Sequence, residues 1–141
     1  MHFLLDTNIV SEAWKPRPSP AVQEWIREHG EECALSVITL AELEYGMHLL
    51  PFSKRRAALE RQIDFLREDF SDALLPFALA EAAAWSEYAA EVTANRGKKF
   101  WNARTIRDSA LAATARAWSL TVATRDIGHF PFVDTVNPFT A

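Results

Sequence analysis

The sequence is poor in three features that mark particular classes of protein: cysteine, long apolar runs and positive charge. Cys33 is the only cysteine, which excludes an intrachain disulfide and a thiolate metal cluster and suits a reducing compartment. No apolar stretch approaches the length of a membrane span, and the run at 3–5 is too short for a signal peptide. We therefore expect a cytoplasmic protein that makes no membrane contact.

The chain has 15 lysine and arginine residues against 19 aspartate and glutamate residues, a net charge of −4. This balance argues against nucleic-acid binding through bulk positive charge, although a local basic patch stays open. Hydrophobic residues make up 49% of the chain and charged residues 24%, a mix typical of a globular protein. The length of 141 residues favours a single domain, 1–141.

Short apolar runs alternate with longer helical patterns. The expected strands are 3–5, 34–37, 73–77 and 120–124, and the expected helices are 21–30, 39–50, 54–70, 78–97 and 105–119. The strand runs are continuously apolar, which predicts a parallel sheet covered on both faces. The alternation of strand and helix predicts an α/β fold with a central, mostly parallel sheet.

This arrangement of strands and helices predicts that four acidic residues lie close together. Asp6 closes the first strand, and Asp126 follows the last one in the turn TRD. Glu42 and Asp108 are expected in the first turns of two helices. Strand C-termini and helix N-termini share one edge of such a sheet, the edge where ligands usually bind. We therefore expect all four carboxylates at that edge.

Each acid also has a purely structural explanation. Asp6 suits a helix N-cap, Asp126 suits a turn, and both Thr39-x-x-Glu42 and Thr105-x-x-Asp108 resemble capping boxes. Capping, however, does not require four separate segments to meet. Carboxylates about 4 Å apart repel each other by roughly 1 kcal/mol even in water. A hard divalent cation, Mg²⁺ or Mn²⁺, would relieve that repulsion, and its chemistry suits phosphodiester hydrolysis. Asn8 and Thr124 could support the carboxylates.

Four motifs resemble those of the PIN-domain family, and more narrowly its VapC/FitB-type toxins of type II toxin–antitoxin pairs. These motifs are LLDTN, TLAELEYG, RDSALAATA and LTVATRD, which occur in the order and spacing of that family and span nearly the whole chain. The resemblance implies a three-layer α/β/α sandwich and a Mg²⁺- or Mn²⁺-dependent endoribonuclease. Its acidic quartet maps onto Asp6, Glu42, Asp108 and Asp126, with Asn8 and Thr124 beside them. It also implies a homodimer, neutralised by a VapB/FitA-like antitoxin that carries the pair to operator DNA.

The stretch 95–107 is basic and contains no acid. Within it, Lys98, Lys99, Arg104 and Arg107 are candidates for contact with an RNA backbone, and Phe100 or Trp101 could stack on bases. The alternative is a solvated loop whose aromatic residues pack inward. None of the histidines has the spacing of a metal ligand, and His129, three residues after Asp126, stays unassigned.

Three other functions are alternatives to this one. A haloacid-dehalogenase-type phosphatase also places Asp after its first strand, but it needs a second acid where this chain has Asn8. A receiver domain needs an Asp after the third strand, and none follows the run at 73–77. A non-catalytic module whose acidic pocket receives the tail of an antitoxin is the alternative that is not an enzyme.

Overall fold

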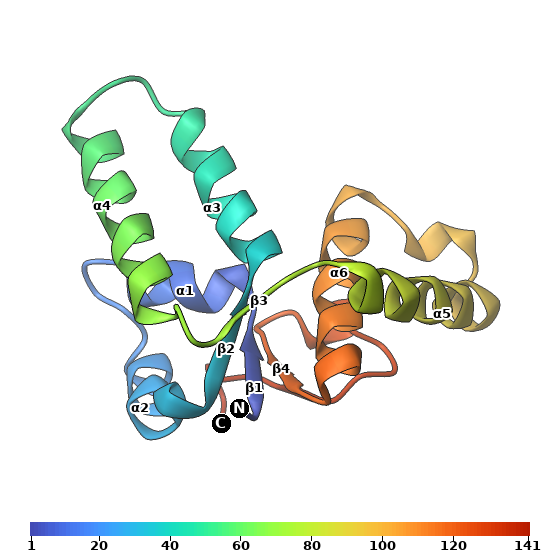
Figure 1. Ribbon diagram of the computed structural model, residues 1–141. Coiled ribbons are helices and arrows are strands. Elements are labelled where there is room, and N and C mark those ends of the chain that lie inside the picture. The colour runs from blue at the N-terminus through green and yellow to red at the C-terminus, as the bar shows by residue number, and fades with distance from the viewer.

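The computed structural model describes residues 1–141 and has a five-stranded sheet at its centre (Figure 1). The strands are β1 (Phe3–Leu5), β2 (Cys33–Ser36), β3 (Leu74–Leu75), β4 (Thr121–Ala123) and β5 (Thr135–Val136). Their order is β3-β2-β1-β4-β5, and every neighbouring pair is parallel. The predicted sheet is therefore confirmed, and it contains no antiparallel pair.

Helices cover both faces of this sheet. They are α1 (Thr7–Ala13), α2 (Pro20–His29), α3 (Val37–His48), α4 (Lys54–Asp69), α5 (Leu79–Arg96) and α6 (Ala103–Trp118). Three single turns of 3-10 helix, η1 (Gly30–Glu32), η2 (Lys98–Phe100) and η3 (Ile127–His129), complete the chain. Figure 1 shows α1 to α4 on one side of the sheet and α5 with α6 on the other, which is the expected three-layer arrangement.

The core has two parts because successive side chains of a strand point to opposite faces. Leu5 and Leu35 belong to the cluster formed with α1 to α4, whereas Leu4 and Ala34 belong to the cluster formed with α5 and α6. All four are buried. A sheet buried on both faces explains why its strands read as continuous apolar runs rather than alternating ones.

One helix and one strand are missing from the expected elements. Helix α1, which follows Asp6 directly, was indicated only by the N-cap explanation of that residue, and β5 contributes only two residues, too few to give a recognisable pattern. The predicted helices at 39–50 and 105–119 begin two residues earlier than expected, with Ser36 and Asn102 as their N-caps. No helix combines the length and the apolar composition that a membrane span requires.

The parallel sheet brings its strand ends to one edge. β1 ends at Leu5 and β4 at Ala123, and the Asp6 N–H continues the β1–β4 pairing by donating to the Ala123 carbonyl at 2.9 Å. β2 ends at Ser36, where α3 begins. Both chain termini lie at the other end of the strands (Figure 1). The carboxyl edge is thus where separate segments converge.

Candidate active site

A cavity of about 300 Å³ at the carboxyl edge of the sheet has no apolar side chain in its lining. Three of the four predicted acids line it: Asp6 after β1, Glu42 in α3 and Asp108 in α6. The other lining residues are Thr7, Asn8, Ser11, Arg104 and Arg107. Segments that are distant in the sequence therefore meet at one polar cavity.

The fourth acid, Asp126, lies just outside the lining and is tied to Asp6 by two polar side chains. The Asn8 amide Nδ2 donates to Asp6 Oδ2 at 3.3 Å and to Asp126 Oδ2 at 3.1 Å. The Thr124 hydroxyl donates to Asp6 Oδ2 at 2.8 Å and accepts from the Asp126 N–H at 2.9 Å. Asn8 thus bridges two carboxylates. A phosphatase of the haloacid-dehalogenase type would need a second acid at this position, so the contacts of Asn8 do not favour that hypothesis.

The capping-box explanation is wrong for Glu42 and Asp108. Each is the sixth residue of its helix, in the second turn, because both helices begin earlier than the pattern indicated. The Ser36 hydroxyl caps α3, and the Asn102 side chain caps α6. Neither carboxylate therefore satisfies the start of its own helix, and both line the cavity instead.

Asp6, by contrast, does cap a helix. Its Oδ1 accepts from the Thr7 N–H at 2.7 Å, as expected of an N-cap residue of α1. Its Oδ2 is the atom held by Thr124 and Asn8. Asp6 therefore caps a helix with one carboxylate oxygen and belongs to the acidic cluster with the other.

The cavity holds a surplus of negative charge, which shows in the pKa values of its acids. Burial raises the pKa of Asp6, and the charge of Asp126 adds to the rise. Burial and the charge of Asp6 raise the pKa of Glu42, against the opposing charge of Arg107. Burial and Asp6 likewise raise the pKa of Asp108 to about 6. A bound cation would reverse this penalty on the charged forms.

The donor set of the cavity fits a hard divalent cation, which prefers carboxylate, hydroxyl and amide oxygens. Glu42 Oε1 and Thr7 Oγ1 are both buried without a hydrogen bond of good geometry, although Thr7 lies near enough to Glu42 to oppose the rise of its pKa. Both oxygens can therefore turn to a cation or to bound water. No group of three or more Asp, Glu, His and Cys side chains is already arranged to hold one ion. The ligands thus match a cation in chemistry, while the coordination shell is not preassembled.

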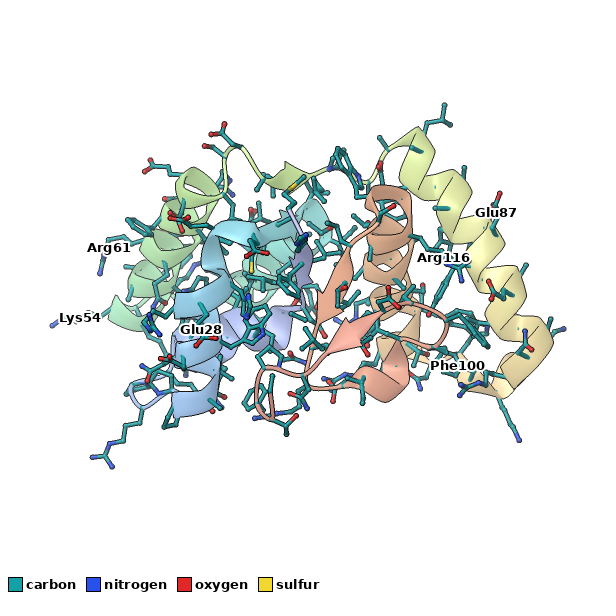
Figure 2. All side chains as sticks on the ribbon, turned by 90° about the horizontal axis from the view of Figure 1, so that it is seen from below. Glu28, Lys54, Arg61, Glu87, Phe100 and Arg116 are labelled. Atoms are coloured by element: carbon teal, nitrogen blue, oxygen red, sulfur yellow. The ribbon has the colours of Figure 1, made fainter.

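The basic residues predicted to contact substrate divide into two pairs. Arg104 and Arg107 of α6 line the cavity, and Arg104 Nη2 donates to Asp126 Oδ2 at 2.8 Å. Lys98 and Lys99 are exposed on η2 and lie outside the lining. Two basic residues of α4, Lys54 and Arg61, belong to neither pair and point away from the body of the molecule (Figure 2).

The aromatic residues of the basic stretch are half-buried against the core, which favours the alternative interpretation over a stacking surface. The rings of Phe100 and Trp101 meet edge to face at 5.3 Å and pack against the α5–α6 core cluster. Trp101 Nε1 also donates to Thr93 Oγ1 at 2.9 Å. They close one end of the core, as the alternative interpretation had it.

Three residues of the site were missed in the sequence. Thr7 and Ser11, one turn apart on α1, line the cavity, but α1 itself is missing from the expected helices. His129 Nδ1 lies 3.0 Å from Asp108 Oδ2. Its nearness to Asp126 in the sequence was the only available signal, and Asp108 lies 21 residues away.

Comparison with known proteins places this geometry in a family. The family model described as the PIN domain matches residues 3–134. The VapC ribonuclease Y4jK of Sinorhizobium fredii is 35% identical, with 97% of each chain covered. Toxin FitB of Neisseria gonorrhoeae is 36% identical, with 97% of this chain and 98% of that protein covered. The crystal structure of FitAcB from the same organism matches with a TM-score of 0.86 over 99% of both chains. The chain belongs to the PIN-domain family and, within it, to the VapC/FitB-type toxins of toxin–antitoxin systems.

Proposed function

We propose that this toxin is a Mg²⁺- or Mn²⁺-dependent endoribonuclease whose site is the carboxyl-edge cavity. The observation that carries the proposal is the convergence of Asp6, Glu42 and Asp108 from three distant segments on one cavity without apolar lining. Asp126 joins them through Asn8. A relative that matches along nearly the whole chain is named a VapC ribonuclease, which supports the same chemistry.

In this proposal the carboxylates of Asp6, Glu42, Asp108 and Asp126 hold the cation directly or through water. A divalent cation supplies two things there: a lower pKa for its bound water and neutralisation of the charge that develops on the phosphate. Asp6 is the most firmly held of the acids, because both of its oxygens accept hydrogen bonds. Glu42, whose Oε1 has no partner, is the acid placed to orient or deprotonate an attacking water.

The arginines at the cavity bind the RNA backbone in this proposal. A guanidinium matches two phosphate oxygens with parallel hydrogen bonds, and Arg104 and Arg107 are the two that line the cavity. Lys98 and Lys99 are exposed one turn before α6 and would contact phosphates further along the strand. These four cations supply locally the positive charge that the chain as a whole lacks.

The toxin's partners are part of the same proposal. We propose a cytoplasmic homodimer that a cognate VapB/FitA-like antitoxin neutralises, with operator DNA bound only through the antitoxin. The FitAcB structure and that of FitAB bound to IR36 DNA, with a TM-score of 0.85 and 35% identity, support the association with an antitoxin and with DNA. Tyr45, Leu49 and Phe52 on and after α3 are 60%, 67% and 89% exposed, and such apolar residues usually mark a protein interface.

The test is expression in a bacterium of the wild type and of Asp6→Asn, followed by mapping of RNA ends. Wild type should arrest growth and generate new ends, whereas Asp6→Asn should do neither. Asp64→Asn, an exposed acid of α4 outside the cavity, is the matched control and should behave as the wild type. Identical growth and identical RNA ends in wild type and Asp6→Asn would refute the ribonuclease assignment.

A second pair of variants separates catalysis from partner binding. Glu42→Gln changes a cavity acid, and Glu44→Gln changes an acid of the same helix that pairs with Arg67 instead. Purified Glu42→Gln should lose RNA cleavage while it still binds the antitoxin, and Glu44→Gln should keep both. A wild type that binds the antitoxin but cleaves no RNA would instead identify the chain as a non-catalytic module.

A further inference from the structure

His129 contacts the acidic cluster from outside the cavity. Its Nδ1 lies 3.0 Å from Asp108 Oδ2, and this is the only hydrogen bond that the Asp108 carboxylate makes. The two side chains are 34% and 10% exposed. His129 does not line the cavity itself, so it acts on the site only through Asp108.

The turn that carries His129 is fixed at both ends. The His129 N–H donates to the Asp126 carbonyl at 2.9 Å, and the Phe130 N–H donates to the Ile127 carbonyl at 3.1 Å. Phe130 is 2% exposed and belongs to the α5–α6 core cluster. One short turn, η3, therefore follows Asp126 directly and holds an imidazole against Asp108 of α6.

We infer that His129 is a positioning residue, whose Nδ1–H holds Asp108 Oδ2 so that Oδ1 stays available to the cation. The inference rests on the proposed function. A carboxylate with a single hydrogen bond is free to rotate once that bond is removed. Outer partners of this kind fix the orientation of metal ligands, and their loss typically costs about 10- to 100-fold in metal affinity. The single turn η3 therefore contacts both Asp108 and Asp126.

If the His129–Asp108 pair served only to stabilise the fold, the effect of removing it on metal binding would be different. A partly exposed pair of this sort contributes little to stability, and if its only role is to join η3 to α6, its loss leaves Mn²⁺ affinity unchanged. Metal affinity, measured without RNA, therefore distinguishes the two roles. The chain also contains a matched pair outside the site, since His2 Nδ1 lies 3.2 Å from the exposed Glu32 Oε2.

The experiment measures the binding of Mn²⁺ alone to the purified toxin, by calorimetry or by electron paramagnetic resonance of the free ion. His129→Ala should weaken Mn²⁺ binding about 10-fold or more. His129→Asn places an N–H near the position of Nδ1 and should restore affinity to within about threefold. His129→Gln, whose amide corresponds to Nε2, should not. His2→Ala should bind as the wild type, and circular dichroism should show that all variants are folded.

Each outcome decides the matter. Unchanged affinity in His129→Ala, or an Asn variant no better than Ala, would overturn the positioning role while the proposed function stands. A wild type that binds Mn²⁺ no better than Asp6→Asn would overturn the metal site, and with it both the proposed function and this inference.

Discussion

At the scale of single residues, the site is defined by how firmly each acid is held. Asp6 has a partner for each oxygen, Asp108 has one hydrogen bond in all, and Glu42 Oε1 has none. Buried polar groups without a partner are costly and uncommon in folded proteins. The loosely held carboxylates are therefore the ones that a ligand or water would satisfy.

Arg104 is expected to act on substrate rather than on stability. Its ion pair with Asp126 is 61% exposed on the arginine side, and such pairs contribute little to folding. Arg104→Ala should raise the KM for RNA about 10-fold, the equivalent of roughly 1.4 kcal/mol, with a melting temperature close to that of the wild type. Steady-state cleavage of a short RNA measures this, with Arg61→Ala on the exposed face of α4 as control. An unchanged KM would contradict the assigned role.

The raised pKa of Asp108 predicts how the stability of the metal-free protein depends on pH. Burial and Asp6 raise its pKa from 3.8 to about 6, with His129 and Arg104 opposing the rise. Between these values the folded chain binds a proton that the unfolded chain has released. Stability should therefore fall as the pH rises from about 4 to about 6. The raised pKa values of Asp6 and Glu42 act in the same direction.

Asp108→Asn removes this penalty, about 3 kcal/mol for a pKa raised from 3.8 to about 6, and should raise the melting temperature of the metal-free protein at pH 7.5 by up to about 10 °C. At pH 3.5, where Asp108 is largely protonated in both states, most of the difference should vanish. Differential scanning calorimetry at both pH values measures this. Asp64→Asn, on an exposed face, should change neither value. A lower melting temperature for Asp108→Asn at pH 7.5 would contradict the reasoning.

At the scale of secondary-structure elements, the starts of two helices set the positions of two acids. Asn102 Oδ1 accepts from the N–H groups of Arg104 and Thr105 at 2.9 and 3.0 Å. The Thr105 hydroxyl in turn accepts from the Asn102 N–H at 2.9 Å. This reciprocal cap fixes the first turn of α6, and hence the turn that follows, which carries Asp108.

Asn102→Ala should therefore destabilise the protein. Loss of an N-cap side chain costs about 1 kcal/mol, which lowers the melting temperature of a domain of this size by about 3–4 °C. Asn102→Asp keeps an acceptor and adds charge at the favourable end of the helix dipole, so it should melt at or above the wild-type temperature. Thermal unfolding followed by circular dichroism tests both variants, and equal melting temperatures for all three proteins would refute the cap.

At the scale of the whole molecule, the site joins the two helical layers. Helix α3 packs in the cluster on one face of the sheet through Leu40 and Leu43, whereas α6 packs in the other through Leu111 and Ala112. Glu42 and Asp108 therefore reach the cavity from opposite layers. Asp6 comes from the strand between them, so a cation at the site would bridge the halves of the domain.

Such a bridge predicts that metal stabilises the entire fold. At a free Mn²⁺ concentration 100 times its Kd, the free energy of unfolding should rise by about 2.7 kcal/mol. Denaturant titrations with and without Mn²⁺ measure this in the wild type. Asp6→Asn should show no such rise, and Asp64→Asn should show the full one. An equal effect of Mn²⁺ on wild type and Asp6→Asn would place the ion elsewhere.

The prediction of the fold was most accurate at two long helices, and it missed a two-residue strand at the edge of the sheet. Helices of 16 and 18 residues at α4 and α5 were located to within one residue at each end, and β5, with two residues, was missed. The start of α3 was misplaced because Thr39 and Glu42 imitate a capping box, although Ser36 makes the cap. Local signals of this kind are short, so several overlapping registers satisfy them.

By itself, the sequence determined the parallel sheet and the shared edge for four acids, because apolar periodicity and the order of strands and helices fix topology. Only the tertiary structure decided the finer arrangement. Asp126 lies just outside the cavity lining, Phe100 and Trp101 pack against the core, and His129 contacts Asp108. These outcomes depend on side-chain packing and hydrogen bonds between segments distant along the chain, and no local pattern encodes them.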